Sequence, residues 1–434
     1  MIGVIADDIT GANDIGSMFS KANYLTYVYN FNVYEPKNED HRKSPDIQIF
    51  DTDSRFDDPK TAYDKVFQAT QAVHKMGARQ FINKTCSVFR GNIGAEFDAM
   101  LDALGEEFAV VVLAFPKNGR KTVDGIHYVH GKKLEESEFR NDPMHPMTQS
   151  NLVDILQSQT KRKVTLISLD TVRQGAAVLE RKITELKQAF NYVILDAADQ
   201  SDLRIIAEAT KEVRVLCGSS ALAEEMAGVL GEPPPQPISL PPYNGEGVFC
   251  AAASLMPQTR EQIEHMRGCG AYVLELPTLE LFDEERRNRL IPDLTGKLSL
   301  HLIEGKDAVL HSSNTPEAVK ATKEEGFKRG MKAPDISRLV SRTLADIVAG
   351  VIEKTGQNRL VIAGGDTSAA VCEKLGVSEM RVWQEISPGL PSCLSFTEPP
   401  LWLVLKSGSF GGADFFASAV AHLKQDLVHD NVNS

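Results

Sequence analysis

A proline-rich segment near the middle of the chain sets the strongest limit on how it can fold. Six of the 21 prolines lie in GEPPPQPISLPP, between Gly231 and Pro242. Proline lacks the backbone N–H that helices and central strands require, so neither runs through this segment. Proline-rich segments instead form stiff, extended spacers. The 434 residues are therefore predicted to form two domains, at 1–230 and 244–434, joined by a linker at 231–243.

Both halves alternate short apolar runs, typical of buried strands, with helix-like stretches. The strands predicted in the first half are Ile2–Ala6, Ile47–Phe50, Gln80–Asn83, Ala109–Phe115, Val164–Ile167, Tyr192–Leu195 and Val213–Leu216, and helices include Pro59–Met76 and Gly175–Ala189. Those predicted in the second half are Val248–Ala252, Ala271–Glu275, Ala308–His311, Leu360–Ala363, Cys393–Phe396 and Leu401–Leu405, before a final helix from about Asp414. The pattern predicts an α/β fold with two domains, each a mainly parallel sheet flanked by helices, and a cleft between them. The polar stretch 120–141 interrupts the pattern and is interpreted as a hairpin or an excursion over a functional site.

The charge balance argues against a nucleic-acid-binding surface. Lys and Arg total 47 against 59 Asp and Glu, a net charge of -12, which disfavours a broad surface for phosphate backbones. The N-terminus lacks the features of a signal peptide, and no apolar run approaches the roughly 20 residues needed to cross a bilayer. We therefore expect a cytoplasmic protein with a small-molecule substrate and with neither a nucleic-acid nor a membrane partner.

The cysteines and histidines do not indicate a metal centre. No two of the six cysteines are spaced like zinc ligands, and most lie in apolar runs, which indicates buried thiols in a reducing compartment. His127, His130 and His145 form no i, i+4 pair and are interpreted as surface or packing residues. No metal-binding residue is assigned.

Two adjacent carboxylates, Asp7 and Asp8, follow the first predicted strand. In an open α/β sheet, ligands bind beyond the carboxyl ends of the strands. Successive side chains of a strand point to opposite faces, so we expect one of the two to face the ligand. The structural alternative is that one carboxylate caps the next helix or pairs with a lysine. Asp14, inside that helix, is interpreted as structural.

Two further polar turns follow strands of the first half. Asp51 to Arg55 contains an arginine whose planar fork could clamp a carboxylate, and the alternative is a solvated loop. Asn83 to Ser87 places a lysine, hydroxyls and a thiol at one strand end, where a polyol or an anion could bind. Because no histidine lies beside Cys86 in the sequence, this thiol is interpreted as a hydrogen-bonding or packing group rather than a nucleophile.

A glycine-rich turn is the strongest site signal of the second half. In Ala363-Gly364-Gly365-Asp366-Thr367-Ser368, the glycines allow a ligand to approach the backbone, and the N-terminus of the following helix favours phosphate. The structural alternative is a capped tight turn. The turn is neither a Walker A loop nor a dinucleotide fingerprint. Ser254, before Pro257, and the loop from Lys406 to Gly412 are weaker signals of the same kind.

Together these motifs resemble the four-carbon acid sugar kinase family. The resemblance rests on Ala6-Asp7-Asp8-Ile9-Thr10-Gly11-Ala12, Asn83-Lys84-Thr85, Gly364-Gly365-Asp366-Thr367-Ser368 and Leu405-Lys406-Ser407-Gly408-Ser409-Phe410-Gly411. It implies an N-terminal domain that binds the sugar acid and a C-terminal domain that binds ATP. It also implies phosphorylation of the terminal C4 hydroxyl of a four-carbon sugar acid. The chain is most similar to the D-threonate kinases, and D-erythronate and 3-oxo-tetronate kinases share the motifs.

The resemblance also implies roles for individual residues. The substrate contacts would come from Asp8, Arg55, Lys84, Thr85, Cys86 and Ser87. The nucleotide contacts would come from Ser254, Gly364, Gly365, Asp366, Thr367 and Gly408. Lys84 or Arg55 would neutralise the substrate carboxylate.

Phosphoryl transfer needs Mg²⁺ and a carboxylate near the attacking hydroxyl. Asp8 is the first candidate for this carboxylate, and Asp366 is its rival, as a base or on the metal side. The alternative from another class is a sugar-acid sensor without catalytic activity. A homodimer is compatible with the sequence.

Overall fold

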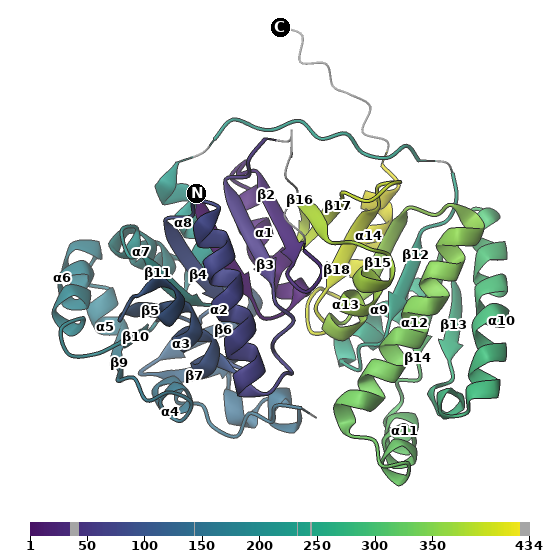
Figure 1. Ribbon diagram of the computed structural model, residues 1–434, viewed down its shortest axis with the longest axis horizontal. Helices are drawn as coiled ribbons and strands as arrows, with labels where there is room; N and C mark the ends of the chain where they lie inside the picture. Colours follow the sequence, from purple (N-terminus) through teal and green to yellow (C-terminus); the bar gives the residue numbers. More distant parts are fainter. Residues whose placement is uncertain (35–42, 143, 232, 244, 426–434) are drawn as a thin grey trace, which may run out of the picture. The chain divides into compact units, whose positions relative to one another are not determined.

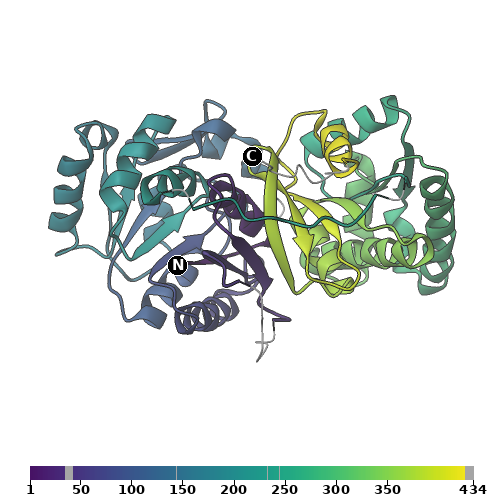
Figure 2. The same ribbon diagram turned by 90° about the horizontal axis from the view of Figure 1, so that it is seen from above.

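The computed structural model describes residues 1–34, 43–142, 144–231, 233–243 and 245–425. The chain divides into two compact units, Met1–Gln236 and Pro237–Ser434, so the division lies within the proline-rich segment. Each unit contains a sheet with helices on both faces (Figures 1 and 2). The predicted fold class, α/β with a mainly parallel sheet in each of two parts, is confirmed.

The first unit is built on a parallel sheet. Its strands lie in the order β2 (Thr26–Asn30), β3 (Ile47–Asp51), β1 (Ile2–Ala6), β4 (Gln80–Lys84), β11 (Val215–Gly218), β5 (Ala109–Val112), β10 (Tyr192–Leu195) and β9 (Val164–Ile167). Every neighbouring pair in this order is parallel. One face carries α2 (Pro59–Lys75), α3 (Ile93–Leu104) and α4 (Leu152–Gln157), and the other carries α1 (Ile9–Ser20), α5 (Leu169–Val172), α6 (Ala176–Leu186), α7 (Gln200–Thr210) and α8 (Ala221–Leu230).

The second unit has a mixed sheet. Its strands lie in the order β13 (Tyr272–Leu276), β14 (Ala308–Ser312), β12 (Phe249–Ala252), β15 (Arg359–Ala363), β18 (Trp402–Lys406), β17 (Leu390–Ser395) and β16 (Glu379–Ser387). The pairs from β13 to β18 are parallel, and β17 is antiparallel to both of its neighbours. One face carries α10 (Glu284–Ile303), α11 (Pro316–Lys328), α12 (Ala333–Thr355) and α13 (Gly365–Lys374), and the other carries α9 (Pro257–Gly268) and α14 (Phe415–Leu423).

The polar stretch that interrupts the first half forms a small separate sheet. Strands β6 (Arg120–Val123), β7 (Ile126–Val129) and β8 (Lys132–Lys133) pair antiparallel. Short 3₁₀ turns precede and follow it at Pro116–Asn118, Leu134–Glu136 and Glu138–Asn141, and another lies at Thr278–Phe282 in the second unit. The predicted hairpin is therefore present.

Local sequence explains most of these elements, as α2 illustrates. The Asp58 side chain accepts hydrogen bonds from two backbone amides of the first turn, and Pro59 occupies the first helical position. The buried residues of this helix recur at helical spacing and include Ala62, Val66, Ala69 and Val73. Three described strands were not predicted, β2 and β16 in the two main sheets and β8 beside the hairpin, and β5 ends at Val112 rather than at Phe115. Phe115 instead pairs with Arg120 across the turn that begins at Pro116.

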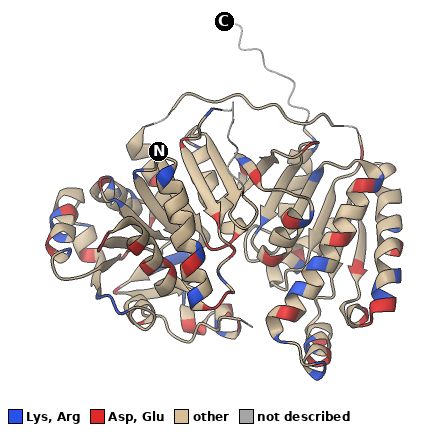
Figure 3. Cartoon of the chain, viewed as in Figure 1, with Lys and Arg blue, Asp and Glu red and all other residues tan. Residues whose placement is uncertain are grey.

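Charged residues of both signs are interspersed along the outer helices of each unit (Figure 3). Some form exposed ion pairs one helical turn apart, such as Lys60 with Asp64, and such pairs contribute little to stability. In the described part of the chain, no helix combines the length and the apolar character needed to span a membrane.

In each sheet the chain first adds strands on one side of its starting strand and then crosses to the other side, and this places the candidate site residues. From β1 the chain continues to β2 and β3 on one side and then to β4 on the other. From β12 it continues to β13 and β14 on one side and then to β15 on the other. Ligands of open α/β sheets bind at such switch points, beyond the carboxyl ends of the strands. Asp7 follows β1 and Ser254 closely follows β12, so both lie at these positions.

A buried arginine ties the end of the linker to the second unit. The Arg359 guanidinium donates hydrogen bonds to the carbonyl oxygens of Leu423 and, at 2.7 Å, of Pro241. Its carbon lies 4.7 Å from the ring centre of Tyr243 and 5.2 Å from that of Trp402. One side chain thus fixes the final helix and the linker against the sheet.

We predict that Arg359→Leu destabilises the second unit by about 3 kcal/mol, because two buried carbonyls lose a charged donor. Urea unfolding followed by tryptophan fluorescence measures this, since both tryptophans, Trp383 and Trp402, belong to this unit. Arg338→Leu is the control, because the Arg338 side chain is 57% exposed and should change stability by less than about 0.5 kcal/mol. Equal unfolding midpoints for the two variants would contradict the prediction.

Candidate active site

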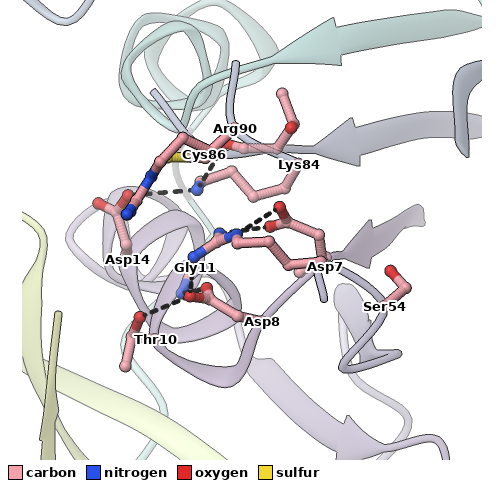
Figure 4. A network of polar contacts seen from close by, with 12 residues as sticks. Asp7, Asp8, Thr10, Gly11, Asp14, Ser54, Lys84, Cys86 and Arg90 are labelled. Atoms are coloured by element: carbon pink, nitrogen blue, oxygen red, sulfur yellow. Dashed lines mark hydrogen bonds and ion pairs between the residues drawn. The ribbon is translucent and has the colours of Figure 1, made fainter. Parts of the chain in front are cut away.

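Three polar turns that are separate in the sequence meet at one edge of the first sheet. In the parallel register, Ala6 of β1 lies opposite Asp51 of β3 and Lys84 of β4. The residues that follow these strand ends therefore lie side by side. We call Asp7, Asp8, Arg55, Lys84 and Cys86 the first cluster; Figure 4 shows Asp7, Asp8, Lys84 and Cys86 among their neighbours.

Arg55 joins the two adjacent carboxylates. Its Nε and Nη2 atoms donate to the two carboxylate oxygens of Asp7, at 2.8 and 2.7 Å, and its Nη1 donates to Asp8. All three side chains are buried. Both carboxylates reach the same arginine because β1 ends at Ala6 and the alternation of strand side chains does not extend into the turn. That only one of the two faces the ligand stays a prediction.

Asp8 also caps α1, which was the structural alternative for this pair. Its Oδ1 accepts from the Gly11 amide at 2.6 Å, and its Oδ2 accepts from the Thr10 hydroxyl at 3.1 Å. A side chain at Gly11 would begin 2.6 Å from Asp8 Oδ1 and 3.0 Å from Lys84 Nζ, so a larger residue would displace these two groups. Burial raises the pKa of Asp8, but the charges of Arg55 and Lys84 outweigh it and lower this pKa below its usual value. Asp8 is therefore an ionised carboxylate at neutral pH.

Lys84 is buried beside a third carboxylate. Its Nζ donates to the Thr85 carbonyl at 3.1 Å and lies 3.6 Å from Asp14 Oδ2. The same Asp14 oxygen accepts from the Ser220 hydroxyl at 2.6 Å. Asp14, interpreted as structural from the sequence, thus lies within contact of a candidate site residue.

Cys86 has a cationic partner that the sequence reading missed. Arg90, one helical turn's length further along the chain, donates from Nε to the Cys86 sulfur at 3.3 Å and from Nη1 to Asp142 at 2.6 Å. Burial raises the pKa of the Cys86 thiol, but Arg90 and Arg55 outweigh it, and the net pKa is lowered. In the sequence, only the four-residue spacing of Cys86 and Arg90 could have indicated this contact. Such a spacing is too common to identify a thiol–arginine pair.

Two histidines attach the small sheet and its following segment to the first cluster. His127 Nε2 lies 3.0 Å from the Ser87 carbonyl, and its Nδ1 lies 3.1 Å from the Thr122 hydroxyl. Burial lowers the pKa of His127 to about 3, so this ring is neutral and donates through Nε2. His145 Nε2 lies 3.1 Å from the Arg55 carbonyl. Both histidines therefore hold turns that carry predicted site residues.

Two further acids near the cluster have raised pKa values. Asp51 is buried, and this burial together with Asp53 raises the pKa of Asp51 well above its usual value. Glu96 accepts a hydrogen bond from the Ser54 hydroxyl at 2.7 Å. Burial, reinforced by the charge of Asp7, raises the pKa of Glu96 to about 8. The Glu96 carboxyl is therefore mainly protonated at pH 7, which limits the negative charge of this edge.

The second sheet brings together three other turns. Ala363 of β15 lies opposite Ala252 of β12 and Lys406 of β18, so the turns that follow these strands are neighbours. A side chain at Gly408 would begin 2.3 Å from Ser254 Oγ. A side chain at Gly364, whose φ is +117°, would begin 2.8 Å from Thr367 Oγ1 and 3.4 Å from the Ser254 amide nitrogen. We call Ser254, Gly364 to Thr367 and Gly408 the second cluster.

The glycine-rich turn leads directly into a helix. α13 begins at Gly365, so the amides of its first turn, from Gly365 to Thr367, have no partner within the helix and lie at its positive dipole end. Asp366, in the first turn, accepts a hydrogen bond from the Ser337 hydroxyl at 2.7 Å. Pro257 begins α9 after Ser254, as expected for a residue at the first helical position. The arrangement suits a phosphate group.

The described residues contain no group of three or more His, Cys, Asp or Glu side chains arranged to hold a metal ion. Of the six cysteines, all except Cys269 are buried. Glycines that keep side chains out of the second cluster leave room for a ligand that approaches the backbone closely.

Both units match known domain families. Residues 2–226 match the model of a sugar-binding N-terminal domain, and residues 249–416 match that of a nucleotide-binding C-terminal domain. A 3-oxo-tetronate kinase of Actinobacillus succinogenes is 32% identical over 96% of this chain and 99% of its own length. The 3-oxo-tetronate kinases of Cupriavidus necator and Pseudomonas fluorescens are 32% and 33% identical, each over 98% of this chain and 97% of the relative.

Solved structures show the same architecture. A protein of Salmonella typhimurium LT2, described as a candidate tRNA synthase, matches with a TM-score of 0.79 and 27% identity over 96% of this chain and 98% of that one. Haemophilus influenzae protein HI1011 matches with a TM-score of 0.72 and 30% identity over 97% of this chain and 100% of that one.

The sugar-binding and nucleotide-binding domains, together with relatives that are named kinases, define the class as a small-molecule kinase. The chain belongs to the four-carbon acid sugar kinase family. It is an ATP-dependent phosphotransferase, as the sequence resemblance implied.

We predict that Glu96→Gln stabilises the protein increasingly between pH 5 and pH 8. The folded state keeps Glu96 protonated up to its pKa of about 8, whereas the unfolded state ionises near the ordinary value of 4.5, so rising pH favours unfolding in this window. The variant removes this loss, and urea unfolding should show it to be more stable than wild type by about 1–3 kcal/mol at pH 8 and by little at pH 4.

The matched control is Glu107→Gln, because the Glu107 side chain is 81% exposed. Its stability relative to wild type should not depend on pH in this range. A difference between Glu96→Gln and wild type that stays constant from pH 4 to pH 8 would contradict the raised pKa.

Proposed function

We propose that the sugar acid binds at the first cluster and ATP at the second, and that the C4 hydroxyl of the acid attacks the γ-phosphate. The observation that carries this proposal is the match of each cluster's own unit to a domain of the corresponding ligand class. Each cluster also lies at the switch point of its sheet, where α/β proteins bind ligands.

Asp8 is the carboxylate that we place beside the attacking hydroxyl. Its lowered pKa makes it a weak base, so its main contribution is to orient the hydroxyl and to stabilise positive charge as the proton leaves. Arg55 holds Asp7 and Asp8 in place through three hydrogen bonds. Because these bonds already use its fork, Lys84 is the better candidate than Arg55 to neutralise the substrate carboxylate.

Thr85, Cys86 and Ser87 line the same turn and supply hydroxyl, thiol and amide groups to the sugar acid. Arg90 and His127 contribute indirectly, since each holds one residue of this turn in place. The substrate-binding turn is therefore arranged before the ligand arrives, which reduces the entropy lost on binding.

At the second cluster, the amides of Gly365 and Thr367 at the start of α13 bind phosphate oxygens, and Ser254 and Gly408 complete the site. The amide of Gly364 is bonded to the Lys406 carbonyl, so Gly364 contributes by letting the phosphate approach the backbone. Mg²⁺ usually keeps several waters and binds one or two carboxylates together with phosphate oxygens. Asp366 is the acidic group of this cluster that fits such an ion, and Mg²⁺ would neutralise charge on the transferring phosphate. This fit supports a role for Asp366 on the metal side rather than as the base.

For the acceptor, we propose 3-oxo-tetronate before D-threonate and D-erythronate. The support is the shared name of relatives that are 32–33% identical over almost the whole chain. A coupled assay of ADP release with 3-oxo-tetronate, D-threonate and both erythronate enantiomers tests it. We expect the highest kcat/KM for 3-oxo-tetronate, and a higher value for D-threonate would reverse this order.

We predict that Asp8→Asn lowers kcat at least about 100-fold and changes the KM for ATP by less than about threefold. Asparagine still caps a helix well, so thermal unfolding should show a folded variant. Asp366→Asn is the matched comparison, and it should raise the Mg²⁺ concentration needed for half-maximal rate. Unchanged turnover in Asp8→Asn would remove Asp8 from the chemistry.

The alternative of a non-catalytic sugar-acid sensor predicts tight binding of the acid without any binding of ATP. Isothermal titration with each ligand separates the two functions. The homodimer stays a prediction, which sedimentation of the purified protein will test.

A further inference from the structure

Lys406 is the last residue of β18 and has no solvent-exposed surface. A lysine in such a position loses hydration, which is costly unless its charge is balanced. Among the residues that the structure describes, no carboxylate forms an ion pair with it. The sequence reading placed Lys406 beside the second cluster and gave it no role.

The Lys406 ammonium donates three hydrogen bonds, two to the loop that follows β18 and one to helix α9. Nζ donates to the carbonyl oxygens of Ser407 and Gly408, both at 2.9 Å, and to the Thr259 hydroxyl at 3.2 Å. The first two bonds fold the chain after β18 back over the lysine. The third attaches this loop to α9.

Thr259 extends the network to the other side of the second cluster. Its hydroxyl lies 3.0 Å from the Gly408 carbonyl and 3.1 Å from Ser254 Oγ. The Lys406 carbonyl in turn accepts from the Gly364 amide at 2.8 Å. Lys406 is thus bonded, directly or through Thr259, to all three turns of the second cluster.

The charge of Lys406 is also poorly compensated. Burial lowers the pKa of Lys406 to about 7, so the ammonium retains its proton only in part at neutral pH. Carbonyl and hydroxyl oxygens stabilise the ammonium without cancelling its charge. An anion near this loop would supply the missing negative charge, and the phosphate groups of a nucleotide are the anions that the proposed function brings there.

We propose that Lys406 is a positioning residue of the nucleotide site, which holds the Gly408 loop against Ser254 and supplies a buried positive charge to the phosphate groups. The proposal rests on the proposed function, since it assumes that nucleotide binds at the second cluster. All of its ammonium N–H groups are used within the protein, so Lys406 acts on phosphate through its field and through the loop, not by direct contact.

Lys406→Met in the full-length protein tests both parts of this role. We expect at least about a tenfold rise in the KM for ATP and in the Kd for ADP by titration, with a much smaller change in the Kd for adenosine, which has no phosphate. Sugar-acid affinity measured without nucleotide should be unchanged. An equal loss of affinity for adenosine and ADP would overturn the charge contribution.

Thr259→Val keeps the test decisive if Lys406→Met folds poorly, because it removes one hydroxyl from the network and preserves volume. We expect it to raise the KM for ATP about threefold to tenfold, in the same direction as Lys406→Met. The control is Lys424→Met, since Lys424 lies in the same unit and is paired with Asp307 at 2.7 Å. This control should leave ATP binding unchanged.

The wild-type protein separates the failure of this proposal from the failure of the proposed function. If wild type binds no ATP, the function proposed for the second cluster is wrong, and the role of Lys406 with it. If wild type binds ATP, and Lys406→Met and Thr259→Val bind it equally well, the role of Lys406 alone is overturned.

Discussion

The parallel pairing of β1 with β3 on one side and β4 on the other is the constraint on which the first site depends. It aligns Ala6 with Asp51 and Lys84, so three turns separated by tens of residues end at one edge. A shift of one residue in this register would turn every side chain to the other face of the sheet. The pairing of β15 with β12 and β18 plays the same part in the second unit.

The two units handle buried charge in different ways. At the first cluster, Arg55 and Lys84 lie against Asp7, Asp8 and Asp14, so that cations and carboxylates are buried together. Burial of charge is costly, and such pairing offsets the cost by direct interaction. At the second cluster, Lys406 is surrounded by neutral oxygens. This difference supports our proposal that the first cluster takes a ligand with hydroxyls and one charge, and that the second takes a strongly anionic ligand.

The small sheet formed by β6, β7 and β8 links fold and function in the first unit. It interrupts the alternation of strands and helices, yet the sheet and the segment that follows it reach two turns of the first cluster. His127 holds the Ser87 carbonyl, and His145, beyond the sheet, holds that of Arg55. Insertions of this kind are tolerated because the sheet beneath them does not depend on them, and they carry much of the specificity of α/β enzymes.

The sequence by itself determined the α/β class and most strands, because continuous apolar runs between polar turns identify buried strands directly. It missed β2, where tyrosine and threonine interrupt the apolar run, and β16, which is mostly half-buried. It also identified Asp8, Arg55, Lys84 and the Gly364 turn as candidates, since each follows a predicted strand. Only the tertiary structure decided that Asp7 and Asp8 share Arg55, that Arg90 contacts Cys86 and that Lys406 connects three turns. Some of these contacts join residues that are far apart in the sequence, and others join residues whose spacing is too common to be informative. Their geometry depends on strand order and register, which local sequence does not encode.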